Sequence, residues 1–106
     1  MSCQQSVIYP CKSTSTFDLK YYLDTHMPLV QRLWGPYGLR KWEVLELNKD
    51  SGYSIQAVLT YDSREDADKA WNSEIAKQII DDIPNFSNEQ PIKIVGTSVG
   101  KAATGT

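Results

Sequence analysis

Apolar and polar residues alternate in four short segments of the chain, which is the pattern of strands with one buried face. The predicted strands cover residues 3–9, 39–48, 53–61 and 92–98. The alternation is clearest in the third strand, one face of which would carry Tyr53, Ile55, Ala57, Leu59 and Tyr61. The segment KDSG lies between the second and third strands and is typical of a hairpin turn.

Two longer segments carry apolar residues three and four positions apart, which is the spacing of an amphipathic helix. We predict a first helix over 17–34, ended by the GPYG turn, and a second helix with one buried stripe over 67–79. The spacing of a capping box precedes both helices, at Ser15 and Asp18 and at Ser63 and Asp66. The predicted elements therefore follow the order β-α-β-β-α-β.

This order predicts an α+β fold of the ferredoxin-like type, a four-stranded antiparallel sheet with two helices on one face. The chain of 106 residues suits a single domain, which we place at 1–98, followed by a flexible tail at 99–106. The other face of the sheet would be bare. We expect a second copy of the chain to cover that face in a homodimer.

The stretch YYLDTHMPLVQRLWG holds the only histidine, His26, and a proline two residues later. In a helix, His26 shares a face with Tyr22 and Val30, and we expect this face to look at the sheet. Pro28 lacks a backbone donor and disfavours helical geometry in the residue before it. Two outcomes are open: the helix kinks beside His26, or it ends just before the proline and a new turn starts there.

Several side chains are candidates for a pocket between the first helix and the sheet. His26 is the candidate proton shuttle, and Tyr22, one turn earlier, is a candidate hydrogen-bond donor. The candidates for binding a substrate are Trp34, Trp42, Tyr53, Asn85 and Phe86. For each of these residues the alternative is a structural role, in the core, in a subunit interface or in a turn.

The overall composition argues against several classes of partner. A net charge of −2 provides no basic face for nucleic acid or for an anionic membrane. The chain has no apolar run of about 18 residues, and its N-terminus lacks the features of a secretion signal, so we expect a cytoplasmic protein. One histidine and two cysteines, Cys3 and Cys11, match no metal-ligand spacing, so we predict no metal, no cofactor and two free thiols.

Four segments together resemble the EthD-domain family: IYP, FDLKYYLDTHMPLV, WGPYGLRKWEV and DIPNFSNEQP. The resemblance extends over about residues 7–97, and the tyrosine-rich helix that leads into HMPL is its most specific part. It implies a dimeric α+β barrel, in which the sheets of two subunits pack together and each subunit holds a cavity between sheet and helices. In related barrels a histidine and a tyrosine do acid–base work in the cavity, and the resemblance carries these roles over to His26 and Tyr22.

The resemblance also implies a function. It suggests an enzyme that acts on a hydrophobic, oxygenated or polyketide-like metabolite by acid–base chemistry of the lyase, isomerase or cyclase type, without a cofactor. Related barrels also act as monooxygenases. One alternative is a homodimer that binds a ligand without turnover, as an accessory protein of a pathway. Another alternative is a structural dimer in which Trp42, Tyr53 and Phe86 fill the cavity. An open cavity beside His26 would argue against this alternative.

Overall fold

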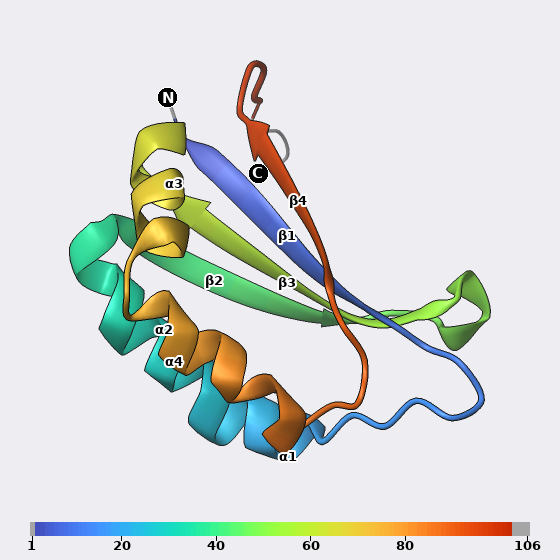
Figure 1. Ribbon diagram of the computed structural model, residues 1–106. Coiled ribbons are helices and arrows are strands. Elements are labelled where there is room, and N and C mark those ends of the chain that lie inside the picture. The colour runs from blue at the N-terminus through green and yellow to red at the C-terminus, as the bar shows by residue number, and fades with distance from the viewer. Residues whose placement is uncertain (1, 103–106) are drawn as a thin grey trace.

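The computed structural model describes residues 2–102, and Figure 1 shows their arrangement. The strands are β1 (Cys3–Pro10), β2 (Leu39–Glu46), β3 (Tyr53–Tyr61) and β4 (Ile92–Thr97). The α- and π-helical elements are α1 (Leu19–Tyr21), η1 (Tyr22–His26), α2 (Met27–Trp34), α3 (Arg64–Asn72) and α4 (Ala76–Asp81). Short turns of 3-10 helix complete the chain: η2 (Gly35–Tyr37), η3 (Lys49–Ser51) and η4 (Ile83–Asn85). Each predicted strand is present, with small differences at the ends.

The four strands form one antiparallel sheet in the order β2-β3-β1-β4. The helices lie on one face of this sheet, as Figure 1 shows. This arrangement confirms the predicted α+β fold of the ferredoxin-like type. Because β1 and β3 occupy the centre of the sheet, their inward side chains form the floor on which the helices pack.

The two faces of the sheet differ in their surroundings. Along β3 buried and half-buried residues alternate, and those on the helix side are the buried ones: Ile55, Ala57 and Leu59 are each no more than 3% exposed. On the opposite side, no helix covers the sheet (Figure 1), and apolar side chains reach the surface. Ile94 on β4 is 56% exposed and Leu45 on β2 is 40% exposed. The described residues therefore leave one partly apolar face without cover.

The first helix begins at Leu19, later than predicted. Its cap is Asp18, whose side chain accepts a hydrogen bond from the N–H of Tyr21 at 3.1 Å. The prediction that Ser15 caps the helix is wrong. Ser15 lies in the preceding loop, where its hydroxyl donates a hydrogen bond to Glu89 and leaves the helix terminus to Asp18.

A widened turn accommodates Pro28. α1, η1 and α2 follow one another without a break, and η1 is a π-helical turn in which the N–H of Met27 donates to the carbonyl of Tyr22. Met27 keeps helical angles, with φ −66° and ψ −38°, despite preceding a proline. The α-helical pattern resumes at Met27, which puts Pro28 in the first turn of α2, where a missing N–H is tolerated. The second predicted outcome is wrong, because the helix does not end before Pro28; a π turn within a continuous helix accommodates the proline instead.

The second predicted helix is divided in two at Ser73, which is extended with φ −75° and ψ 156°. α3 starts as predicted, since the Ser63 hydroxyl accepts a hydrogen bond from the N–H of Asp66 at 3.1 Å. The hydroxyl of Ser73 donates to the carbonyl of Ala70 at 2.6 Å and helps to end α3. Beyond this point the predicted stripe is right only in part: Ile79 is buried and Ile75 is half-buried against the core, but Glu74 and Gln78, which the prediction also placed on the stripe, are exposed.

The predicted tail is described only in part. Residues 99–102 form no helix or strand, and Val99 is 89% exposed. Residues 103–106 lie outside the described residues, so the domain boundary stays a prediction. Between residues 2 and 102, no helix combines the length and the apolar character needed to cross a membrane.

Candidate functional site

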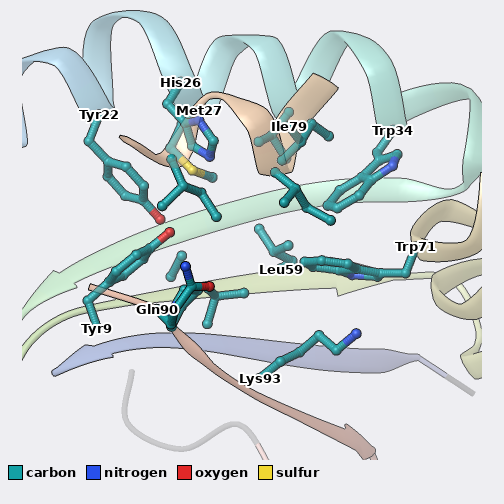
Figure 2. A pocket seen from close by; sticks show the side chains of 16 residues that line it. Tyr9, Tyr22, His26, Met27, Trp34, Leu59, Trp71, Ile79, Gln90 and Lys93 are labelled. Carbon is teal, nitrogen blue, oxygen red and sulfur yellow. The ribbon is translucent and has the colours of Figure 1, made fainter. Parts of the chain in front are cut away.

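A cavity of about 240 Å³ lies between the sheet and the helices η1, α2 and α4. Its wall is mostly apolar, and Figure 2 shows helix side chains above it and strand side chains below. The polar members of the wall are Tyr9, Tyr22, His26, Gln90 and Lys93. For scale, a dry cavity of about 150 Å³ is large enough to bind benzene. The space beside His26 is therefore adequate for a compact ring compound.

The π turn sets the direction of His26. Its widened geometry places side chains four residues apart almost in line, so the rings of Tyr22 and His26 stack with centroids 5.2 Å apart and planes 13° apart. Tyr22 is 1% exposed and His26 is 4% exposed. Of the two adjacent tyrosines, Tyr22 is the one that lines the cavity, as predicted, while Tyr21 points to a neighbouring element.

Asp82, directly after α4, holds the outer side of this cluster together. His26 Nδ1 lies 2.9 Å from Asp82 Oδ2, while Asp82 Oδ1 accepts from the Tyr21 hydroxyl at 2.6 Å and from Asn85 Nδ2 at 2.8 Å. An ionised carboxylate can only accept hydrogen bonds, so His26 Nδ1 carries the proton. Nε2 is left with a free lone pair on the ring that faces the cavity (Figure 2).

The surroundings of His26 and Asp82 lower the pKa of both groups, which leaves the imidazole neutral and able to act as a base. Burial lowers the pKa of His26 below its ordinary value and outweighs the hydrogen bond and charge of Asp82, which raise it. Burial raises the pKa of Asp82, but hydrogen bonds from Tyr21, Asn85 and His26 outweigh it and leave that pKa below its ordinary value. At neutral pH the pair therefore consists of a carboxylate and a neutral imidazole.

Two phenols lie beside the imidazole. Tyr9 on β1 and Tyr22 on η1 both line the cavity, and Figure 2 shows their hydroxyl groups pointing towards each other. Burial raises the pKa of each phenol above its ordinary value, so both stay protonated at neutral pH. Two neutral O–H donors therefore line the same cavity as His26.

Of the residues predicted to bind a substrate, only one lines the cavity. Trp34 lines the cavity, whereas Phe86 packs on the far side of the His26 ring with centroids 4.5 Å apart. Asn85 contacts Asp82 and not the cavity. Trp42 is held on β2, where its Nε1 donates to Gln31 at 3.0 Å, and Tyr53 is 36% exposed at the start of β3.

This placement argues against the hypothesis of a filled cavity. The residues proposed to fill it, Trp42, Tyr53 and Phe86, lie outside its wall, and the space remains open. Trp42 and Tyr53 also have no place in the site proposed below.

Sequence reasoning missed Asp82, Tyr9 and Lys93. Asp82 is the first residue of the DIPNFSNEQP segment, one of the four that resemble the family, but no acidic residue was among the predicted site residues. Its signal was its place in this segment. Tyr9 and Lys93 gave no signal of their own, because only the pairing of their strands turns them towards the helices: Tyr9 lies opposite Ile55, and Lys93 opposite Val7.

The fold and the site define a class of protein: a ferredoxin-like α+β domain with an apolar pocket and, in its wall, a histidine that is paired with a carboxylate outside the wall. A family model described as the EthD domain matches residues 13–90, and the chain belongs to this family. Among curated proteins, none matches the chain.

Solved structures with the same fold agree with this assignment. The chain is similar to an EthD-like protein from Ralstonia eutropha, with 23% identity, 96% of each chain covered and a TM-score of 0.81. It is also similar to an EthD-family protein from Bacillus halodurans, with 20% identity, 93% of this chain and 100% of that chain covered, and a TM-score of 0.69. SnoaB, a cofactor-independent oxygenase from Streptomyces nogalater, shares 8% identity over 94% of this chain and 95% of its own, with a TM-score of 0.62.

Proposed function

We propose that this protein catalyses proton transfer next to a carbonyl group of a small hydrophobic molecule, using only its own side chains. The observation that carries the proposal is His26 in the wall of an apolar cavity, paired with Asp82 behind it. A neutral imidazole in the correct tautomer is a general base whose pKa suits a reaction near neutral pH. The cofactor-independent oxygenase among the structures with this fold supports a small-molecule enzyme as the class.

In the proposed step, Nε2 of His26 takes a proton from the carbon next to the carbonyl. The electron pair of the broken C–H bond forms a carbon–carbon double bond, and the π electron pair of the carbonyl moves onto its oxygen to give an enolate. The hydroxyls of Tyr22 and Tyr9 donate hydrogen bonds to this developing negative charge. Asp82 stabilises the imidazolium that forms and fixes the orientation of the ring, as carboxylates do in other histidine-based sites. Return of the proton to a different atom would complete an isomerisation.

Three further residues have supporting roles in this proposal. Trp34 forms an apolar wall for the substrate, and Phe86 presses on the imidazole ring from the side away from the cavity. Asn85 assists Asp82 and does not bind the substrate itself.

The experiment that tests this function is deuterium exchange into 2-tetralone, a two-ring ketone with an acidic C–H next to its carbonyl. In D₂O the wild-type protein should speed up exchange above the buffer rate, as followed by proton NMR. A His26→Gln variant should lose the acceleration, whereas the matched control Lys69→Met, on the solvent side of α3, should keep it. A wild type that gives no acceleration, or a His26→Gln variant that retains it, would contradict the proposal.

The second candidate function is ligand binding without turnover, which the apolar wall of the cavity favours. Under this alternative, 2-tetralone binds to the wild type and to His26→Gln with equal affinity, and neither protein speeds up exchange. Calorimetric titration of both proteins, together with the exchange assay, therefore separates a binding protein from a catalyst.

The proposed working form is a homodimer joined through the bare face of the sheet. The exposed apolar residues on this face, Leu45, Ile92 and Ile94, support it. We expect sedimentation equilibrium to give a dimer for the wild type and a monomer for Ile94→Lys, because a buried unpaired ammonium opposes association. A matched Leu23→Lys change, at an exposed position of η1 on the helix side of the sheet, should leave the dimer intact. A monomeric wild type would contradict this expectation.

A further inference from the structure

Lys93 gives the cavity a positive charge at its sheet side. It belongs to β4, an edge strand, and its side chain lines the cavity on the face that packs against the helices. Its Nζ lies 4.2 Å from the centroid of the Trp71 ring, and Figure 2 shows the two residues together below the helices. Lys93 is an exposed residue, so its ammonium keeps contact with water while its side chain lies along the cavity.

The charge of Lys93 is not balanced by other residues of the cavity wall. Among the described residues that line the cavity, none is an aspartate or a glutamate. The ion pairs formed between residues 2 and 102 do not include Lys93. The whole chain, in contrast, has 13 acidic and 11 basic residues. The cavity wall therefore carries an ammonium group and no carboxylate, although the net charge of the chain is negative.

Two buried side chains, Gln5 and Trp34, hold the Trp71 ring on which the Lys93 ammonium lies. The Nε1 of Trp71 donates a hydrogen bond to Oε1 of Gln5, which is 1% exposed on β1. The Trp71 ring also packs against Trp34, with centroids 4.6 Å apart. Because Gln5 and Trp34 fix the indole, the ammonium rests on an immobile aromatic surface and loses less freedom when it binds a ligand.

We propose that the cavity binds a compact apolar anion, with a carboxylate as the simplest case, and that Lys93 is the residue that selects it. The anionic group contacts Lys93 on the sheet side, while the apolar body extends towards Tyr22 and His26 on the helix side. The assignment of His26 as the reacting end rests on the proposed function, but the selection of an anion does not. A volume of about 240 Å³ suits a body of one or two rings.

A different explanation of Lys93 is protection of an edge strand. Charged residues that point inwards on edge strands prevent unwanted pairing with other sheets. Under this explanation, replacing Lys93 changes aggregation but not the choice of ligand. The two explanations therefore predict different results for the same variant.

The experiment compares 2-naphthoate with its neutral counterpart 2-naphthamide, by calorimetric titration at low salt. The wild type should bind naphthoate the more tightly. Lys93→Met, which keeps the length and loses the charge, should weaken naphthoate roughly fivefold to tenfold and leave naphthamide unchanged. Lys93→Arg should restore most of the preference. The matched control Lys69→Met changes the net charge equally, on the solvent side of α3, and should have no effect.

The outcomes are distinct from those of the exchange assay. If Lys93→Met leaves the ratio of the two affinities unchanged, or if the wild type binds no naphthoate at millimolar concentration, the anion proposal is wrong, while proton transfer by His26 stands. A His26→Gln variant should retain the preference for naphthoate. Its loss of catalysis together with an intact preference would separate the two proposals on the same protein.

Discussion

A Phe86→Ala variant is expected to lose about 3–5 kcal/mol of its free energy of unfolding, the usual cost of removing a buried phenylalanine. Phe86 is 3% exposed, and its ring lies 4.8 Å from Tyr22, 5.3 Å from Phe17 and 4.5 Å from His26, measured between centroids. It therefore joins the loop after α4 to the first helix and to the site. The free energy of unfolding of a domain of this size is about 5–15 kcal/mol in total, so the variant would lose a large fraction of it.

Urea denaturation at one fixed protein concentration measures this effect, since association would otherwise change the apparent stability. Val99→Ala is the control, because Val99 is 89% exposed and its truncation should cost less than about 0.5 kcal/mol. Phe86→Leu should cost less than Phe86→Ala, because it leaves a smaller void. A loss below about 1 kcal/mol for Phe86→Ala would show that the aromatic cluster is not part of the cooperative core.

The fold was accessible from the sequence because its signals are local and agree with one another. Alternation in the strands, apolar spacing in the helices and the KDSG turn each specify an element, and the order of elements restricts the topology. The misplaced boundaries have a common cause. Ser15 and Ser73 make hydrogen bonds with partners that the sequence pattern does not show, namely Glu89 for Ser15 and the carbonyl of Ala70 for Ser73.

The site was accessible only in part. His26 and Tyr22 lie on one helix face, so their proximity follows from spacing alone. Asp82 is 56 positions from His26 in the sequence, and its contact depends on how α4 packs beside the first helix. Local patterns carry no information about such a contact. The same holds for Lys93, whose inward direction depends on the register between β1 and β4.

Pro28 and the site are linked through one local feature. A proline two residues after the only histidine suggested an irregular helix. The irregularity in the structure is a π turn over 22–26. Such turns frequently occur at functional sites, because they alter the direction of a side chain without ending the helix. Here the turn stacks His26 on Tyr22 and leaves Nδ1 within reach of Asp82. Pro28 therefore indicates, from the sequence alone, the helical segment that orients His26, the proposed base.

The pH dependence of exchange should separate the roles of His26 and Asp82. The base must be neutral, so the rate rises with pH through the pKa of His26 and levels off above it. Because burial lowers that pKa, the plateau should extend below the ordinary value of about 6.5. His26→Gln should lose the rising limb together with the general-base contribution, a fall of roughly 10²–10⁴-fold on the plateau.

Asp82→Asn should give a different profile from His26→Gln. Asp82 raises the pKa of His26 through its hydrogen bond and its charge, so the amide should move the rising limb to lower pH. The plateau should also fall, because an amide can donate to Nδ1 and so place the proton on Nε2, where it blocks the base. The measurement is kcat/KM for exchange of 2-tetralone between about pH 4.5 and about pH 8, a range that spans the ordinary pKa of histidine. A limb that stays in place, or one that moves to higher pH, would show that Asp82 does not act through His26.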